Sequence, residues 1–348
     1  MQTIIRKVDE NCIDEMIMKE AGALLKEGAL VAFPTETVYG LGANALDSEA
    51  AAKIYAAKGR PSDNPLIVHI ADMDALSLIV AEIPEAATKL AEKFWPGPLT
   101  MVMKKSEVVP YGTTGGLDTV AVRMPAHPIA LEMIRHGGGY IAAPSANTSG
   151  RPSPTLASHV ADDMDGIVPL ILDGGAVGIG IESTIVDLTD EIPTILRPGF
   201  ITKEMLQEVV GEVQIDKGLD ADSKTPPKAP GMKYRHYAPK AELMIVEGSS
   251  EAVVAKINAL VRENEEKGIC TGIIGTEETV SRYPTGIVKC MGTRNDELSI
   301  SSHLYGILRE FDESDAKVIY SESFEEGAMG SAIMNRLLKA AGHKIIHV

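Results

Sequence analysis

Two short stretches of the chain carry side chains that suit chemistry on a polyphosphate. Lys58 and Arg60 flank a glycine, so two cations stand one residue apart. Ser145 and Asn147 flank an alanine and offer a hydroxyl and an amide at the same spacing. Outside a helix, residues two positions apart can point the same way, so each pair can face one ligand. A surface Lys/Arg pair and an ordinary Ser-Asn turn explain the same residues without a ligand.

A predicted helix leads into the first pair. Residues 47–57 are rich in alanine, begin with two candidate N-cap residues and are followed closely by Gly59. Because glycine readily ends a helix, Lys58 and Arg60 would lie in an exposed loop beyond it.

The second pair follows a predicted buried strand. The apolar run 140–143 ends at Pro144, so Ser145 and Asn147 would lie beyond the strand's carboxyl end. Open α/β sheets bind their ligands at this edge. A ligand placed there would meet both side chains.

Composition limits the classes of protein to which the chain can belong. Its 348 residues suggest two domains, and its net charge of −16 argues against a broadly basic nucleic-acid surface. The three cysteines have no CxxC spacing, which supports neither a zinc site nor a disulfide framework, and we expect them to be buried. No apolar run reaches the roughly 18 residues that span a membrane, and the N-terminus lacks a signal-peptide core. We therefore expect a cytoplasmic protein that does not engage a membrane.

The order of predicted strands and helices indicates two α/β units. Up to residue 211, strands and helices alternate irregularly with hairpin-like returns, which favours a mixed sheet. From residue 240 the alternation is regular and predicts a small, mostly parallel sheet. Between them, 212–239 contains several prolines and cations and few aliphatic residues, as is typical of a linker. We therefore expect domains at 1–211 and 240–348, joined by this linker.

Several predicted elements are specific enough to test. Thr202 should cap a helix at 203–210, and a second helix should span 297–312. A strand is expected at 271–275. The glycine-rich residues 112–116 should form a flexible loop.

Four motifs stand in a fixed order along the chain. They are PTETVYGLG at 34–42, KGRP at 58–61, SAN at 145–147 and KYRHYAP at 233–239. Together they closely resemble the threonylcarbamoyl-AMP synthases of the long, two-domain form. The resemblance covers the whole chain and implies an α/β fold, in which a YrdC-type twisted mixed-sheet domain precedes a small Rossmann-like α/β domain.

The resemblance also implies an enzyme. Such proteins condense L-threonine, bicarbonate and ATP into L-threonylcarbamoyladenylate and release pyrophosphate. The product would supply the threonylcarbamoyl group of the adenosine beside the anticodon of tRNA, and other proteins would carry out the transfer. ATP would arrive as its Mg²⁺ complex, and neither a resident metal nor a tightly bound cofactor is implied. Adenylation builds up charge on phosphate oxygens, so nearby cations would stabilise its transition state.

The same resemblance implies catalytic and binding roles for individual residues of this chain. The catalytic residues would be Lys58, Arg60, Ser145 and Asn147. ATP would be contacted by Arg60, Asn64, Thr119, Ser145, Ser153, Arg197 and Tyr237. Threonine would be held by Thr37, His69, Arg123, Ala143 and Ser183, with Thr35 as an alternative to Thr37.

Some of these residues have simpler explanations. His69 lies in an apolar strand, where a histidine is often a hydrogen-bonded core residue. Arg123 could pair with Asp118 or Glu132 instead of capturing the carboxylate of an amino acid. Tyr237 could pack against a domain instead of closing over a nucleotide.

Two other functions stay open. A YrdC-type domain also serves O-carbamoyltransferases that make a carbamoyl-adenylate, but those proteins carry zinc-binding cysteine pairs and additional domains. A double-stranded RNA-binding module is the second alternative, although the acidic balance opposes it. A contact with tRNA or double-stranded RNA, and with downstream transfer proteins, is compatible with the enzyme as well. We expect 231–237, which is rich in basic and aromatic residues, to act as a lid over the nucleotide.

Overall fold

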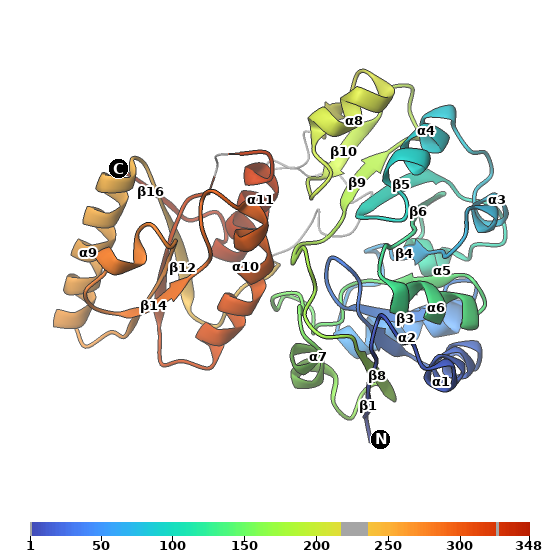
Figure 1. Ribbon diagram of the computed structural model, residues 1–348, viewed down its shortest axis with the longest axis horizontal. Coiled ribbons are helices and arrows are strands. Elements are labelled where there is room, and N and C mark those ends of the chain that lie inside the picture. Colours follow the sequence, from blue (N-terminus) through green and yellow to red (C-terminus); the bar gives the residue numbers. More distant parts are fainter. Residues whose placement is uncertain (1, 217–235, 325–326) are drawn as a thin grey trace. The chain divides into compact units, whose positions relative to one another are not determined.

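A computed structural model describes residues 2–216, 236–324 and 327–348. These residues form two compact units, which are described separately (Figure 1). The first unit takes the described residues of Met1–Ser149, Ser153–Gly178 and Glu182–Lys233. The second takes those of Tyr234–Val348 and two short segments from earlier in the chain, Gly150–Pro152 and Ile179–Ile181. Most of the expected lid lies outside the described residues.

A mixed sheet of eleven strands forms the centre of the first unit. The strands are β1 (Ile4–Lys7), β2 (Val31–Phe33), β3 (Gly40–Asn44), β4 (Ile67–His69), β5 (Leu99–Lys104), β6 (Thr119–Arg123), β7 (Ile141–Ala143), β8 (Leu170–Asp173), β9 (Thr184–Asp187), β10 (Thr194–Arg197) and β11 (Gln214–Ile215). Their order is β1-β8-β2-β3-β7-β4-β6-β5-β9-β10-β11. Parallel and antiparallel neighbours alternate irregularly; β4, for example, is parallel to β6 and antiparallel to β7. The mixed α/β architecture predicted from the sequence is confirmed.

Helices pack on both faces of this sheet (Figure 1). They are α1 (Glu15–Lys26), α2 (Ser48–Lys58), α3 (Leu76–Ile79), α4 (Glu85–Phe94), α5 (Tyr111–Thr114), α6 (Pro128–His136), α7 (Ala157–Met164) and α8 (Lys203–Val210), with a 3-10 turn η1 (Met73–Ala75). Along β2, Val31 and Phe33 join the apolar cluster of α1 and α6, whereas Ala32 joins that of α2 and α4. This division follows from the pleat, which points successive side chains to opposite faces. Burial on both faces explains why central strands read as short, continuous apolar runs.

Local signals in the sequence position these helices. Asp47 accepts a hydrogen bond from the first turn of α2, and Thr202 accepts one from the first turn of α8. Gly22 allows α1 and α6 to approach closely, because a Cβ atom there would lie 2.5 Å from the carbonyl oxygen of His136.

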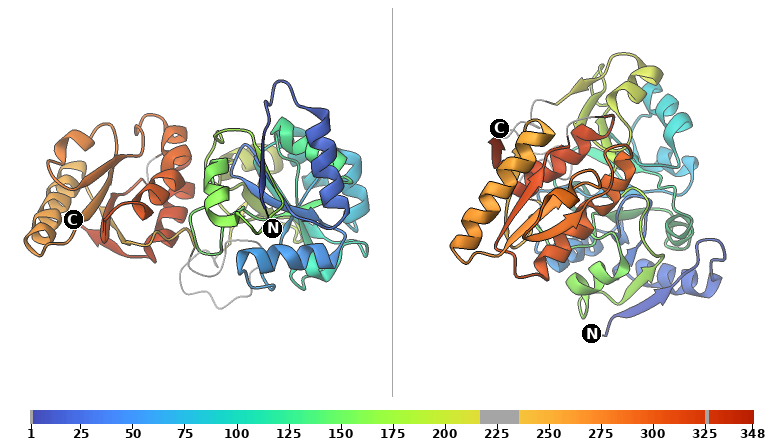
Figure 2. Two further views of the ribbon diagram at one scale, coloured as in Figure 1. Left: turned by 90° about the horizontal axis from the view of Figure 1, so that it is seen from below. Right: turned by 60° about the vertical axis from the view of Figure 1, so that its left-hand side comes forward.

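Five parallel strands form the sheet of the second unit. They are β12 (Glu242–Glu247), β13 (Thr271–Gly275), β14 (Ile287–Cys290), β15 (Val318–Glu322) and β16 (Ile345–His347), and the helices are α9 (Ser250–Glu266), α10 (Glu297–Asp312) and α11 (Gly330–Ala341), with a 3-10 turn η3 (Val280–Arg282). The strand order is β14-β13-β15-β12-β16, and every pair is parallel. Figures 1 and 2 show α9 on one face of this sheet and α10 and α11 on the other. The small parallel sheet predicted for this half of the chain is confirmed.

Most of the tested boundaries agree with the structure. The helices at 203–210 and 297–312 and the strand at 271–275 are confirmed. The flexible loop expected at 112–116 was wrong, because 112–114 belong to α5 and only Gly115 and Gly116 form a turn after it. The buried side chain of Thr113 anchors the helix, and its hydroxyl donates to the carbonyl of Ala45 at 2.7 Å.

The expected burial of the cysteines was also wrong. Cys12 and Cys290 are exposed, and Cys270 is half-buried. Cys12 lies in a surface turn and Cys290 ends β14, which is an edge strand of its sheet. None of the described helices is long and apolar enough to cross a membrane.

Candidate active site

Lys58 is the last residue of α2 and only 2% of its surface is exposed. Gly59 follows it in the left-handed conformation, at a φ of 59°, and ends the helix. The ammonium group donates hydrogen bonds to the backbone carbonyls of Ser145 and Asn147. The exposed loop expected for Lys58 was therefore wrong. The helix runs one residue further, and carbonyl acceptors compensate for the burial of the charge.

The loop around Ser145 is organised by hydrogen bonds that its side chains make within the loop. The Ser145 hydroxyl donates to the side-chain oxygen of Asn147 at 2.6 Å, and the side-chain nitrogen of Asn147 donates to the Thr148 carbonyl at 2.8 Å. The backbone amide of Ser149 donates to the Lys58 carbonyl at 2.9 Å. Lys58 and this loop thus form one interlocked group, in which the lysine holds the loop backbone in place.

Arg60 has a different environment from Lys58. It is half-buried, and its Nη2 donates to the carbonyls of Asn64 at 3.3 Å and Pro65 at 3.1 Å. Asn64 is 2% exposed, and its side-chain oxygen has no hydrogen-bond partner among the described residues. A buried amide oxygen without a donor is costly, so this atom is suited to receive a donor from a ligand.

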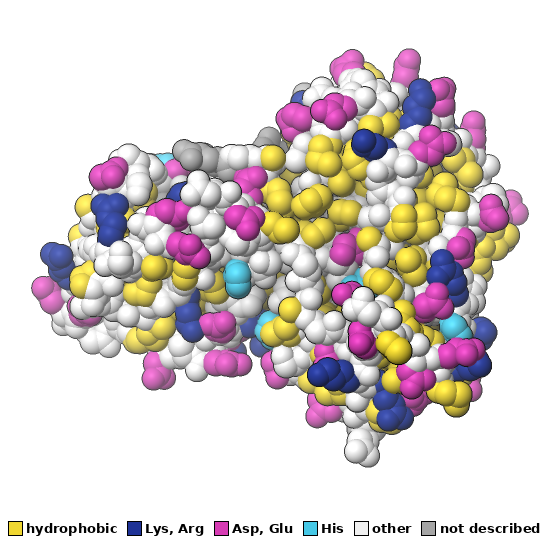
Figure 3. Space-filling model, viewed as in Figure 1, with side chains coloured by type: hydrophobic (Ala, Val, Ile, Leu, Met, Phe, Trp, Pro, Cys, Tyr) yellow, Lys and Arg dark blue, Asp and Glu magenta, His cyan; other side chains and the backbone are white. Residues whose placement is uncertain are grey.

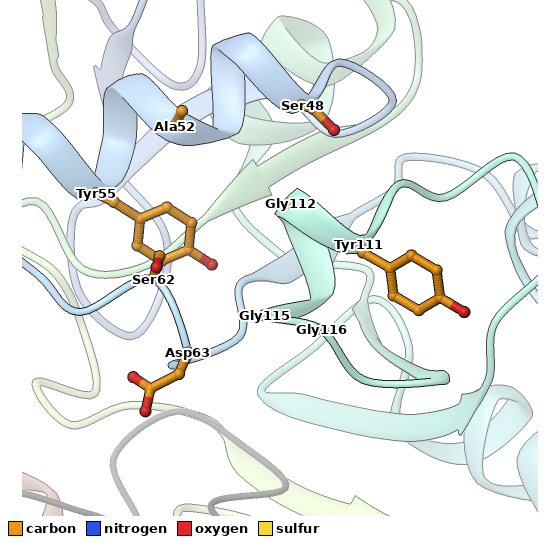
Figure 4. Close-up of a pocket in the computed structure, with 9 residues that line it drawn as sticks. All are labelled: Ser48, Ala52, Tyr55, Ser62, Asp63, Tyr111, Gly112, Gly115 and Gly116. Atoms are coloured by element: carbon orange, nitrogen blue, oxygen red, sulfur yellow. The ribbon is translucent and has the colours of Figure 1, made fainter.

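A pocket of about 380 Å³ lies beside this turn (Figure 4). Its described lining residues are Ser48, Ala52, Tyr55, Ser62, Asp63, Tyr111, Gly112, Gly115 and Gly116. Figure 4 shows Tyr55 reaching from α2 toward Ser62, and its hydroxyl donates to the Asn64 carbonyl at 3.2 Å. Among these lining residues only Asp63 carries a charge, and it is negative. The pocket therefore does not suit a polyphosphate.

Arg123 is the centre of a second polar cluster. It ends β6, is 4% exposed, and lies by register between His69 on β4 and Thr100 on β5. Its guanidinium group donates to the hydroxyl of Thr37 at 2.9 Å and to the carbonyl of Gly97 at 3.3 Å. Three neighbouring strands and the loop after β2 therefore converge on one buried cation.

Glu36 is the carboxylate beside this cation. One of its oxygens lies 2.7 Å from Nη2 of Arg123. Both Glu36 oxygens and Nη2 are shielded from solvent, and none of the three makes an aligned hydrogen bond to a described residue, so the contact is an ion pair only. The alternative partners considered for Arg123, Asp118 and Glu132, make no ion pair with it in the described structure. A substrate carboxylate can reach Nη2 only if Glu36 moves.

His69 lies next to Arg123 and is a buried, neutral histidine. Its Nδ1 is 3.1 Å from the Ile67 carbonyl oxygen, and its ring meets that of Phe33 edge-on. Burial, together with the positive charge of Arg123, lowers the pKa of His69 to about 3. A neutral imidazole can form a hydrogen bond with a substrate without adding a second positive charge beside Arg123.

Ser183 and Arg197 extend this cluster. The Ser183 hydroxyl lies 2.8 Å from that of Thr100. Arg197 ends β10 and donates to the carbonyl of Ser183 at 3.0 Å and to its hydroxyl at 3.2 Å. Because Thr100 pairs with Arg123 across the strands, Arg197 lies with the residues expected to hold threonine, although the resemblance assigned it to ATP.

Thr35 and Thr37 differ in how their hydroxyl groups are used. The Thr35 hydroxyl donates to the Val38 carbonyl at 2.6 Å and accepts the backbone amide of Thr37 at 3.2 Å, which closes a local turn. The Thr37 hydroxyl lies 2.9 Å from that of Thr35 and, unlike it, also accepts from Arg123. Of the two, Thr37 is therefore the one that belongs to the Arg123 cluster.

The predicted residues lie at two ends of the adjacent strands β7, β4 and β6. Asn64 precedes β4, Thr119 begins β6 and Ser145 follows β7, and the register brings these positions to one end. His69 and Arg123 mark the other end. These strands have three to five residues, so the two groups are roughly 7–13 Å apart along the strands.

The remaining predicted residues have other surroundings. Ala143 is the last residue of β7, at the Ser145 end of the strands. Ser153 is buried, and its hydroxyl donates to Glu182 at 2.6 Å. Tyr237 belongs to the second unit, where its ring centroid lies 5.0 Å from that of Tyr305.

Two members of the Arg123 cluster were not predicted, the half-buried Glu36 and the buried Thr100. Glu36 lies in the first motif between two threonines that were predicted to bind the substrate, so its position and charge could have identified it as a member of the site. Thr100 gave no signal, because a strand hydroxyl gains its partners only from the register of its neighbours.

Two family models match the chain. Residues 23–199 match the Sua5/YciO/YrdC model, which is described as "telomere recombination". Residues 201–342 match a model described as "threonylcarbamoyl-AMP synthase, C-terminal domain". The two matches follow one another along the chain and leave unmatched only its ends and residue 200 between them.

Proteins similar to this chain over its whole length are known. It is 51% identical to a threonylcarbamoyl-AMP synthase of Pyrococcus abyssi over 346 residues, which cover 99% of this chain and 100% of that protein. It is 50% identical to a threonylcarbamoyl-AMP synthase of Bacillus subtilis over 339 residues, 97% of this chain and 96% of that protein. A crystal structure of P. abyssi Sua5 complexed with L-threonine superimposes with a TM-score of 0.95 at 50% identity, over 99% of this chain and all of that one.

Proposed function

The chain belongs to the Sua5/YciO/YrdC family, and on this premise we propose that it makes L-threonylcarbamoyladenylate from L-threonine, bicarbonate and ATP. The resemblance seen in the four motifs is confirmed. The observation that carries the proposal is the similarity to threonylcarbamoyl-AMP synthases, which extends over nearly the full length of this chain and of those proteins. The Arg123 cluster and the loop held by Lys58 support it, because they place a buried guanidinium group and a loop with polar side chains on the same strands.

The proposed reaction has two bond-forming steps. The amino group of threonine adds to the carbon of bicarbonate, and loss of water leaves a carbamate. A carbamate oxygen then attacks the α-phosphorus of ATP, and the bond from this phosphorus to the bridging oxygen breaks as pyrophosphate leaves. The second step gathers negative charge around the α-phosphorus, so preorganised donors at that point lower its barrier.

In this proposal the loop at 145–147 binds the reacting phosphate. Lys58 fixes its backbone, and Asn147 donates to the α-phosphate or the carbamate. Ser145 donates there as well, by exchanging its hydrogen bond to Asn147 for one to the substrate. Arg60 supplies a cation with access to solvent. Asn64, Thr119, Ser153 and Tyr237 complete the proposed nucleotide contacts.

Threonine is assigned to the other end of the strands. Arg123 would bind its carboxylate, for which a guanidinium group is well suited. Thr37 and the neutral His69 would contact its polar groups, with Ser183 beside them, and Ala143 would contact the substrate from the Ser145 end of the strands. Arg197 donates to Ser183, so we propose that it acts where the two substrates meet.

Other components of the proposal rest on the chemistry alone. Mg²⁺ is taken as part of the ATP substrate complex. The product would pass to proteins that transfer the threonylcarbamoyl group to tRNA, and a direct contact with tRNA is a further proposal. We also propose domains at 1–211 and 240–348 and the cytoplasm as the compartment, where ATP and tRNA are available.

The proposal is tested by measuring pyrophosphate release from ATP. We expect release that requires L-threonine and bicarbonate together. One methyl group in an apolar pocket is worth only about 1–3 kcal/mol, so L-serine should be a weak substrate. Absence of stimulation by threonine, or equal stimulation by unrelated amino acids, would overturn the proposed function.

The RNA-binding alternative receives less support from the surface. On the face drawn in Figure 3, Lys and Arg side chains are scattered among acidic ones and do not form a stripe. Binding that depends on phosphate contacts needs clustered cations. The same assay separates the alternatives, because a pure binding module would release no pyrophosphate.

A further inference from the structure

The second unit has a topological switch point between β13 and β15. These strands are neighbours, but β13 connects onward to β14 on one side, whereas β15 connects to β16 beyond β12 on the other. The loops that follow them therefore leave in opposite directions. In open α/β sheets such a divergence opens a crevice at the carboxyl edge, and ligands bind there.

A buried carboxylate organises this edge. Glu322 ends β15 and is 1% exposed. One of its oxygens accepts hydrogen bonds from the hydroxyl groups of Thr279 at 2.5 Å and Tyr283 at 2.7 Å, and the other accepts Nη2 of Arg294 at 2.7 Å. With both oxygens satisfied, Glu322 serves as a fixed counter-ion that holds Arg294 in one orientation.

Arg294 is presented at the surface of this edge. Its Nη1 donates to the Ser323 carbonyl at 3.1 Å, and its guanidinium carbon lies 5.3 Å from the centre of the Phe324 ring. A third of its side chain is exposed. These hydrogen bonds engage two of the five N–H groups that a guanidinium carries, and the group is held ready for an anion.

A pocket of about 230 Å³ lies beside Arg294. Its described lining residues are Arg294, Asn295, Glu297, Ile300, Phe324, Gly327 and Ile333. Ile300, Phe324 and Ile333 are buried and provide an apolar wall. Glu297 places a carboxylate in the same lining and accepts the backbone amide of Met329 at 3.1 Å. A carboxylate has about four acceptor positions, so Glu297 can accept further donors.

We propose that this pocket binds a small aliphatic α-amino acid. The carboxylate of the ligand pairs with Arg294, its ammonium group with Glu297, and its side chain packs on the apolar wall. A phosphate ester would set two negative charges against Glu297, which disfavours a nucleotide. The volume is below the roughly 300–1,000 Å³ of pockets for drug-sized ligands, which fits a ligand of few atoms. The described lining residues all belong to the second unit, and none of them has a role in the proposed reaction.

Isothermal titration of the full chain with L-valine tests the site. Valine has the shape of threonine without its hydroxyl, so it could also bind at the proposed threonine site of the first unit. Arg123→Lys controls for such binding, because this substitution should leave the pocket beside Arg294 intact. We expect saturable binding to wild type and to Arg123→Lys, and at least tenfold weaker binding to Arg294→Gln, because a charged hydrogen bond is lost. Lys289→Ala removes a half-buried cation of the same unit that pairs with Glu310, and should bind valine like wild type.

Arg294→Gln leaves the buried Glu322 without its counter-ion, so a second variant is needed. Asn295→Trp fills the mouth of the pocket from an exposed position and should abolish binding without disturbing the core. Unchanged binding in Asn295→Trp, or no saturable binding to wild type, would overturn the site.

The ligand class is tested with two analogues of valine. Valinamide lacks the carboxylate and isobutyrate lacks the ammonium group, and we expect both to bind at least tenfold more weakly than L-valine. Glu297→Gln should remove the preference for valine over isobutyrate. Equal binding of all three compounds would overturn the assignment to an amino acid. The pyrophosphate assay is unaffected by these outcomes, so the two proposals fail separately.

Discussion

Replacing Lys58 with methionine tests whether its buried ammonium group holds the catalytic loop. Methionine keeps the length and the apolar stem of the side chain but cannot donate to the carbonyls of Ser145 and Asn147. Two hydrogen bonds from a charged donor are lost, each worth about 1.5–3 kcal/mol. The loss is partly offset, because no ammonium group then has to be desolvated. We expect the free energy of unfolding of the first unit to fall by about 2–4 kcal/mol.

Urea unfolding followed by tryptophan fluorescence measures this change. The chain has one tryptophan, Trp95, which is buried in the first unit, so the signal reports on that unit. Pyrophosphate release by Lys58→Met should fall by on the order of 10² or more, because the loop loses its preorganised position. Lys53→Met is the matched control. Lys53 lies on the same helix and donates to one carbonyl, that of Gly28 at 2.6 Å, and its loss should cost less stability and leave activity unchanged.

Two results would refute this reasoning. If Lys58→Met were as stable as Lys53→Met but inactive, the ammonium group would act on the substrate and not on the loop. If Lys58→Met kept wild-type activity, the loop would need no lysine at all. Lys58→Arg distinguishes a requirement for charge from one for shape, since a guanidinium group is too large for a site closed around an ammonium group.

Three further predictions concern the two ends of the strands. Arg60→Ala should lower adenylate formation by on the order of 10² while the urea midpoint changes little, because Arg60 is half-buried; an equal loss of stability would contradict this. Arg123→Lys should raise the KM for threonine far more than it lowers kcat. The reason is that one ammonium group cannot reach Thr37, Gly97 and a ligand carboxylate together. An unchanged KM would show that Arg123 does not bind threonine. The pKa of His69 is about 6.5 in the unfolded chain and about 3 in the folded chain. The contribution of the neutral side chain to the free energy of unfolding is therefore complete above pH 6.5 and falls as the pH drops toward 3. Between pH 7.5 and 5 this loss is about 2 kcal/mol, and urea titrations should show it in wild type but not in His69→Gln.

The sequence was sufficient where local signals decide the structure. The Thr202 cap and the regular alternation after residue 240 predicted their elements correctly, since a cap and a period are read from neighbouring residues. The burial of Lys58 could not be predicted in this way. A lysine after a run of alanines normally faces solvent, and its acceptors come from Ser145 and Asn147, almost ninety residues later. Thr100 was missed for the same reason, because its partners are set by the strand register.

Two of the sites that the sequence did not predict share one physical feature. Lys58 and the pair formed by Glu36 and Arg123 are charged groups removed from water, and burial of charge costs stability unless each atom is satisfied. Lys58 is satisfied by fixed carbonyls, so its charge rigidifies a loop. Glu36 and Arg123 retain unsatisfied buried atoms, so their arrangement is the less stable of the two and the one that a ligand can most easily rearrange. We therefore expect binding of threonine to change the surroundings of Glu36 while the loop held by Lys58 keeps its form.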